Sequence, residues 1–142
     1  MKRFIAAAVL VAFGATAAFA GAIEDRRALM KDGVAATTKT LTGYAKGETP
    51  FDAAKVKDLL KVYVDASAKL PTLFPDDSKT GDTTAAPKIW EDMAGFKAAA
   101  AKFGADATAA EAATDTASFA KAFGVITANC GSCHGTYRVK KG

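Results

Sequence analysis

The stretch that decides the fold is FAKAFGVITANCGSCHGTY, residues 119–137. Its apolar side chains recur every three or four residues, which is the period of a helix with one buried face. Two cysteines continue the same stripe, so both belong to the buried face of the expected helix. The stripe consists of Phe119, Phe123, Ile126, Cys130, Cys133 and Tyr137.

Three upstream runs carry the same spacing, and no stretch with period two competes with them as a strand. Short connections between such helices favour antiparallel neighbours. The sequence therefore predicts an all-α domain, an antiparallel up-down-up-down four-helix bundle. The four helices are expected over about residues 23–46, 51–70, 87–103 and 116–140. The inner stripe of the first is expected to be Ile23, Arg27, Met30, Val34, Thr37, Leu41 and Tyr44.

Helix signals mark most of the boundaries between these runs. Gly47 ends the first run, and Thr49, Pro50 and Asp52 are typical of the start of the next helix. Pro87 is expected to open the third helix. The composition agrees with a helical domain. Half of the residues are hydrophobic but only 9% are aromatic, and alanine, the best helix former, supplies much of the hydrophobic share.

The N-terminal segment is predicted to be a secretory signal peptide, residues 1–20, ahead of one domain over residues 21–142. Lys2 and Arg3 precede an apolar run that ends in Ala18-Phe19-Ala20, an A-x-A cleavage pattern. That run is shorter than the roughly 20 residues of a membrane span, and no later stretch is apolar enough for one. Without Lys2 and Arg3, the 19 basic residues become 17 against 15 acidic ones, a net charge of +2. This charge is too small to indicate nucleic acid.

The residues Cys130-Gly131-Ser132-Cys133-His134 form C-x-x-C-H, the attachment pattern of haem c. Positions i and i+3 share a face of a helix, so the two thiols can reach the two vinyl groups of one porphyrin. His134, at i+4 from Cys130, lies on the same side and can bind the iron. The sequence therefore predicts one covalent haem c held by Cys130, Cys133 and His134.

Two cysteines in an exported chain allow three other interpretations. An exported chain often joins two cysteines in a disulfide. A redox dithiol belongs with a strand–helix pattern, which this sequence lacks. A zinc site needs more ligands than the one histidine and two cysteines of the chain.

The second axial ligand decides what the iron can do. Methionine is the usual partner of histidine in electron-transfer cytochromes. The chain has Met1, Met30 and Met93, and Met1 leaves with the predicted signal peptide. In an up-down-up-down bundle, Met30 and Met93 both lie at about the level of His134, so spacing alone leaves both open.

The sequence resembles the cytochrome c′ family, and above all its low-spin members with methionine and histidine ligands. The resemblance covers nearly all of residues 21–142. A C-x-x-C-H motif alone marks any c-type cytochrome, whereas its position in the last helix, near the C-terminus, is far more specific to this family. The residues that carry it are Arg26–Lys31, Ala45–Glu48, Pro50–Asp52, Leu70-Pro71, Phe74-Pro75, Pro87–Trp90, Cys130–His134 and Tyr137-Arg138.

The resemblance implies roles that spacing does not give. It implies that Met30 is the sixth ligand, and that Arg26 and Arg138 lie near the haem propionates. Trp90, Phe96 and Tyr137 are expected to line the haem pocket, and a homodimer is common among such proteins.

The expected function is therefore periplasmic electron transfer between redox protein partners by a non-enzymatic monohaem cytochrome. The alternative is a five-coordinate cytochrome c′, in which the residue at position 30 covers the haem and the iron binds nitric oxide or carbon monoxide.

Overall fold

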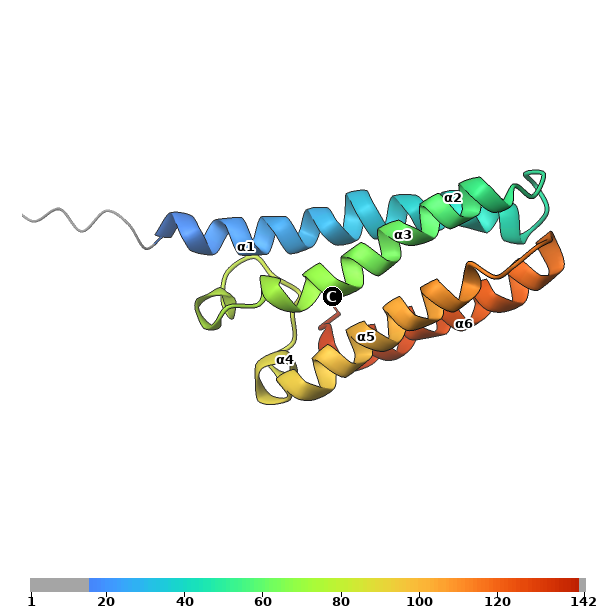
Figure 1. Cartoon of the computed structure of the whole chain (residues 1–142). Helices are drawn as coiled ribbons and strands as arrows, with labels where there is room; N and C mark the ends of the chain where they lie inside the picture. Colours follow the sequence, from blue (N-terminus) through green and yellow to red (C-terminus); the bar gives the residue numbers. More distant parts are fainter. Residues whose placement is uncertain (1–15, 141–142) are drawn as a thin grey trace, which may run out of the picture.

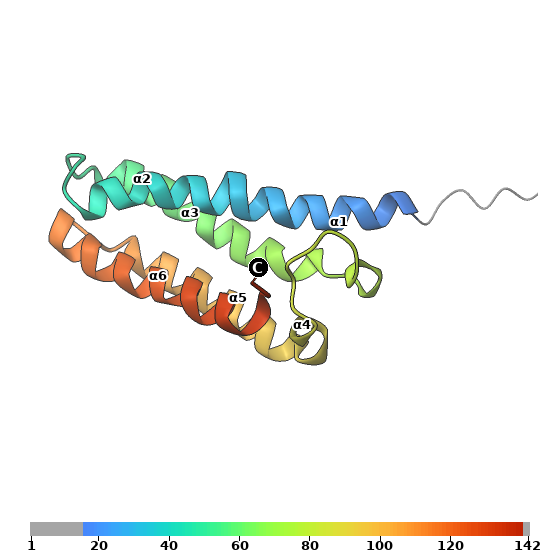
Figure 2. The same ribbon diagram turned by 180° about the vertical axis from the view of Figure 1, so that it is seen from behind.

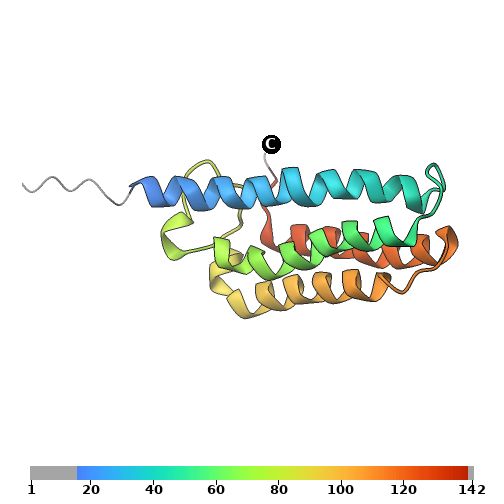
Figure 3. The same ribbon diagram turned by 45° about the horizontal axis from the view of Figure 1, so that its top comes forward.

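The computed structural model describes residues 16–140, with side chains from residue 21. The long helices run up and down beside one another (Figure 1), and the view from behind and the tilted view give the same arrangement (Figures 2 and 3). The predicted four-helix bundle is thus confirmed. The signal peptide predicted over residues 1–20 lies largely outside the described residues, and cleavage after Ala20 stays a prediction.

The first long helix has three consecutive parts: α1 (Thr16–Ala28), the π-helical segment η1 (Leu29–Ala35) and α2 (Ala36–Ala45). It ends as predicted at Gly47, whose φ of 71° suits glycine better than any other residue. The second helix, α3 (Ala53–Lys69), begins later than expected. Asp52 is its N-cap, and its carboxylate accepts from the backbone N–H of Lys55 at 3.1 Å.

The third helix is broken where one continuous helix was expected. Pro87 precedes the short helix α4 (Lys88–Glu91), and α5 (Met93–Ala110) follows after a break at Asp92. The Asp92 backbone is not helical, with φ −135° and ψ 59°, and its side chain accepts from the N–H of Gly95 at 3.0 Å. Aspartate readily caps a new helix in this way, which explains the break.

The fourth helix, α6 (Thr116–Tyr137), ends three residues before the predicted Lys140. Arg138 is extended and pairs with Ala85 in an isolated β-bridge. The carbonyl of Tyr137 accepts from the N–H of Ala86 at 3.0 Å. The segment that pairs with this end of the chain, residues 73–86, begins at the last residue of η2 (Leu70–Leu73) and includes the turn η3 (Asp76–Ser78). We call residues 73–86 the strap.

Two apolar clusters fill the bundle. The larger lies toward the end where α2 meets α3 and α5 meets α6, and includes Leu41, Leu60, Tyr63 and Phe119. The smaller lies toward the strap and includes Leu70, Ile89, Phe96 and Tyr137. Within residues 16–140, no helix is both long enough and apolar enough to cross a membrane.

Candidate haem site

The last turns of α6 carry the attachment motif. Cys133 and His134 line a cavity, whereas Cys130, one turn earlier, is half-buried and is not part of its wall. The thiol of Cys130 lies 3.8 Å from the carbonyl oxygen of Ile126. The structure shows no disulfide between the two cysteines. No three His, Cys, Asp or Glu side chains of the described part of the chain gather to hold a bare metal ion.

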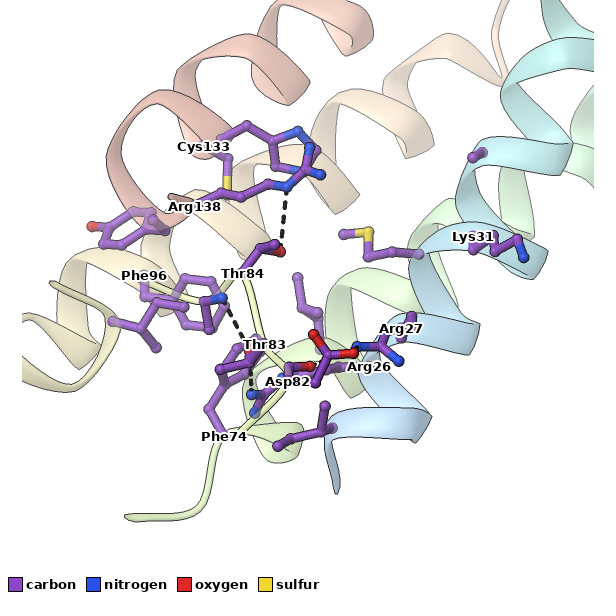
Figure 4. Close-up of a pocket in the computed structure, with 18 residues that line it drawn as sticks. Arg26, Arg27, Lys31, Phe74, Asp82, Thr83, Thr84, Phe96, Cys133 and Arg138 are labelled. Atoms are coloured by element: carbon purple, nitrogen blue, oxygen red, sulfur yellow. Dashed lines mark hydrogen bonds and ion pairs between the residues drawn. The ribbon is translucent and has the colours of Figure 1, made fainter. Parts of the chain in front are cut away.

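The cavity has a volume of about 660 Å³ and opens between α1, η1, the strap and the end of α6. This volume falls within the roughly 300–1,000 Å³ of small-molecule and cofactor sites. In Figure 4, Cys133 of α6 and Arg138, which follows α6, lie on one side of the cavity, and Arg26, Arg27 and Lys31 come from the first helix on the other. The wall also includes Met30, Phe74, Thr83, Thr84 and His134.

Met30 is part of the cavity wall and Met93 is not. Met93 packs against the smaller apolar cluster, as expected for a core methionine. Met30 lies in η1, where the helix is π-helical, and such segments are frequent at functional sites. Spacing had left the two methionines open as ligands, and only Met30 lies in one cavity with His134.

The π-helical segment also changes which arginine is buried. Periodicity placed Arg27 on the inner stripe, but the structure buries Arg26, which is 6% exposed, and leaves Arg27 on the surface. A π-helix takes more residues per turn than an α-helix. Compared with a continuous α-helix, the residues upstream of η1 are therefore rotated about the helix axis. The position that faces the interior moves from Arg27 to Arg26.

The Arg26 side chain is hydrogen-bonded to the strap rather than exposed to solvent. One guanidinium nitrogen donates to the carbonyl of Leu73 at 3.2 Å and to Ser78 Oγ at 2.9 Å. The other donates to the carbonyl of Ser78 at 3.0 Å and to Thr83 Oγ1 at 2.7 Å. The guanidinium also lies 4.7 Å from the ring centroid of Phe74, over its face. All four hydrogen-bond acceptors are neutral oxygens, so the propionate role predicted for Arg26 stays a prediction.

Arg138 and Arg27 make weaker contacts with the strap. The Nε atom of Arg138 donates to Thr84 Oγ1 at 3.4 Å. Arg27 forms an exposed ion pair with Asp82 at 3.0 Å. Arg138 lies on the cavity wall as its predicted propionate role requires, and that role also stays a prediction.

Aromatic residues close one side of the cavity. Phe96 and Tyr137 line it as expected, and Phe74 stacks edge-on against Phe96 with a centroid distance of 4.9 Å. Trp90 was expected on the wall but lies behind it, where its indole N–H donates to the carbonyl of Phe74 at 3.0 Å. Sequence analysis missed Phe74 and the strap hydroxyls as wall residues, because no local pattern shows that the strap folds over the first helix.

The surroundings of the motif keep its groups uncharged at neutral pH. Desolvation, and then the positive charge of Arg138, lower the pKa of His134, which leaves the imidazole neutral with a free lone pair. Burial raises the pKa of the Cys130 and Cys133 thiols. A neutral imidazole is the form that binds iron.

These residues fit a haem. The cavity is large and mostly apolar, two thiols and an imidazole lie within one and a half turns of α6, and cationic side chains at the wall can face two propionates. A four-helix bundle with such a site is a c-type haem protein.

Comparisons with known proteins agree. Residues 21–138 match the family model described as Cytochrome C′. The chain is 45% identical to cytochrome c′ of Rhodopseudomonas palustris over 139 residues, which cover 96% of this chain and 94% of that protein. It is 44% identical to cytochrome c-556 of Agrobacterium fabrum over 124 residues, 86% of this chain and 84% of the relative.

Solved structures show the same fold. The structure of cytochrome c′ from Rhodopseudomonas palustris superposes with a TM-score of 0.79 at 46% identity, covering 85% of this chain and 98% of that one. A variant of cytochrome c′ from Alcaligenes xylosoxidans in complex with nitric oxide superposes with a TM-score of 0.75 at 31% identity, covering 86% of this chain and 97% of that one.

The chain belongs to the cytochrome c′ family, a family of non-enzymatic haem proteins. It carries one haem c, bound covalently through Cys130 and Cys133. The relatives include both cytochromes c′ and cytochromes c-556, so membership alone leaves the axial ligands of the iron open.

Proposed function

We propose that this protein carries single electrons in the periplasm, with His134 and Met30 as the two axial ligands of a low-spin haem. The observation that carries the proposal is that Met30 and His134 line one cavity, while Met93 lies outside its wall. When bound, the haem iron supplies a one-electron couple between its ferric and ferrous states.

The residues around the iron have separate roles in this proposal. His134 is neutral and binds from the α6 side. Met30 offers a soft thioether from η1, and methionine ligation raises the reduction potential. The apolar wall formed by Phe96, Ile89 and Leu70 keeps water from the ligand atoms. No side chain is required to react.

The compartment and the partners rest on the sequence. A leader with Lys2, Arg3 and Ala18-Phe19-Ala20 supports export. Haem attachment through Cys130 and Cys133 suits an exported protein as well. The partners in this proposal are redox proteins that donate and accept single electrons.

The test is the pair of variants Met30→Ala and Met93→Ala. The wild-type ferric protein should show the weak far-red charge-transfer band of methionine–histidine ligation, and the ferrous protein should bind carbon monoxide poorly. Met30→Ala should abolish the band, turn the iron high-spin, admit carbon monoxide and lower the reduction potential. Met93→Ala should leave all four properties unchanged. A wild-type protein that is high-spin and binds carbon monoxide avidly would disprove Met30 ligation.

A second candidate function is the reversible binding of nitric oxide or carbon monoxide by five-coordinate iron. The observation that favours it is the 45% identity to a protein named cytochrome c′, together with the nitric oxide complex of a related cytochrome c′ variant. In that case Met30 covers the haem without binding the iron. The carbon monoxide titration of the wild-type protein separates the two functions.

A further inference from the structure

Arg26 is a buried cation with an unusual set of partners. It is 6% exposed, and its four hydrogen bonds all go to residues of the strap. Each of these contacts spans 47 or more positions of the chain. A buried guanidinium that loses one acceptor keeps a desolvated N–H without a partner, which is costly. Arg26 therefore holds α1 and the strap in one fixed arrangement.

Two hydroxyl groups of the strap are oriented to receive Arg26. Ser78 is fully buried and donates its one proton to the carbonyl of Pro75 at 2.9 Å, so its oxygen is free to accept from Arg26. Thr83 Oγ1 accepts from Arg26 at 2.7 Å and from the backbone N–H of Ala85 at 3.1 Å. Ala85 is the residue that pairs with Arg138 after α6. The strap thus connects the helix of Met30 to the helix of His134.

Met30 lies one turn after Arg26, inside η1. An α-helix fixes the rotation of each residue through its regular ladder of hydrogen bonds, whereas a π-helical segment departs from that ladder. The rotation of Met30 toward the cavity therefore depends on the anchors on either side of it. Downstream the anchor is Val34, which is 8% exposed, and upstream it is Arg26.

We propose that Ser78 and Thr83 are positioning residues that act through Arg26 to hold Met30 against the iron. This inference rests on the proposed ligation by Met30. It predicts that the strap hydroxyls, without contacting Met30, control the strength of the bond between Met30 and the iron. Their loss leaves the covalent haem in place and weakens the methionine ligand.

The test uses Thr83→Val, Ser78→Ala and a matched control in the same connection between α3 and α4. Thr83→Val removes the hydroxyl with little change of shape, and Thr83→Ser restores it. The control is Thr72→Val, because the hydroxyl of Thr72 is exposed and donates only to the carbonyl of Lys69 at 2.7 Å. The readouts are the far-red band of the ferric holoprotein, its spin state and the carbon monoxide affinity of the ferrous form. Helix content is followed by circular dichroism.

Thr83→Val and Ser78→Ala should weaken the far-red band and raise carbon monoxide affinity about tenfold, on the order of one hydrogen bond to a charged group. Helix content should not change. Thr83→Ser and Thr72→Val should behave like the wild type. If Ser78→Ala fails to give folded holoprotein, Thr83→Val and Thr83→Ser carry the test, because Thr83 is only half-buried.

Three results would overturn the inference, and they are distinguishable. A wild-type protein without the far-red band overturns Met30 ligation and this inference with it. A wild-type protein with the band, but with unchanged band and carbon monoxide affinity in Thr83→Val, overturns this inference alone. Equal effects of Thr83→Val and Thr72→Val would show general loosening of the connection and would also overturn it.

Discussion

The two ends of the bundle are held together in different ways. The end farther from the strap, which we call the closed end, is filled by the larger apolar cluster, with Phe51, Phe119 and Phe123 in ring contact. The end near the strap, the cavity end, contains the smaller cluster around about 660 Å³ of cavity. There, Arg26 and the bridge between Ala85 and Arg138 tie the elements together.

This difference assigns stability and function to different ends of the bundle. Side chains alone fill the core of the closed end, so we expect that end to stay folded without the haem. The cavity end lacks the side-chain volume to fill itself, and the porphyrin completes it. The closed end should therefore respond to core substitutions with a loss of stability and an unchanged spectrum. The cavity end should lose stability when the haem is lost.

The largest effect is expected from removing the covalent attachment, with the double variant Cys130→Ala/Cys133→Ala. Denaturing gel electrophoresis with a haem stain should show colour at the mature mass for the wild type and none for the variant. Hydrogen exchange of the variant should lose protection around Met30, Ile89 and Phe96 and keep it around Leu60 and Phe119, because the closed end has its own core. Uniform loss of protection along all helices would contradict the division of the bundle into two ends.

The next effect is a core truncation at the closed end. Phe119 is fully buried, so Phe119→Ala should lower the free energy of unfolding by about 3–5 kcal/mol, measured by urea denaturation. The visible spectrum of the folded holoprotein should not change. Val125→Ala on the same helix is the control, because Val125 is 49% exposed and its truncation should cost less than about 0.5 kcal/mol. A changed haem spectrum in Phe119→Ala would show that the two ends are coupled.

A smaller effect is expected where α3 and α5 approach each other closely. A Cβ atom added at Gly104 would lie 2.9 Å from Cβ of Ser67. Gly104→Ala should therefore cost about 1–3 kcal/mol in thermal or urea unfolding. Adding Ser67→Gly should recover part of this loss, and an additive double variant would exclude the steric cause.

A matched control for this contact lies on α6. Nothing lies within 4 Å of a Cβ atom at Gly124. Gly124→Ala should therefore leave the packing intact and stabilise the helix by about 0.4–1 kcal/mol. Destabilisation by Gly124→Ala would show that contact with Ser67 is not what distinguishes the two glycines.

The smallest effect concerns the caps of the closed end at low pH. The backbone N–H of Lys55 lowers the pKa of Asp52, and the backbone N–H of Ser118 lowers that of Asp115. Both pKa values are lower in the folded than in the unfolded chain, so the unfolded state binds more protons below about pH 4. The capping contribution is present above that pH and is lost as the pH falls through the folded values.

The melting temperature measured between pH 7 and pH 3 checks this expectation. It should fall less steeply in Asp52→Asn/Asp115→Asn than in the wild type, because asparagine caps a helix without titrating in this range. Parallel curves would show that the loss of stability in acid has its origin elsewhere.

Much of this molecule follows from local patterns in the sequence. The period of the apolar residues predicted the four helices, and the spacing of Cys130, Cys133 and His134 predicted the cofactor. The break at Asp92 and the end of α6 at Tyr137 were missed, because a side-chain cap and a pairing with the strap compete there with helix propensity. The burial of Arg26 was missed as well, since it depends on contacts with Ser78, 52 positions away.

The π-helical segment also bears on how the sequence of this helix can change during evolution. A π-helix holds an extra residue compared with an α-helix, so η1 (Leu29–Ala35) can lose one residue and return to an ordinary helix. Such a deletion would leave the residues upstream on the same faces of the helix, because the π-helical segment is what accommodates the extra residue. Arg26 would then lie about two α-helical turns before Val34 and would keep its buried place. A descendant that differs by a single codon here would keep both its bundle and the cation that binds the strap.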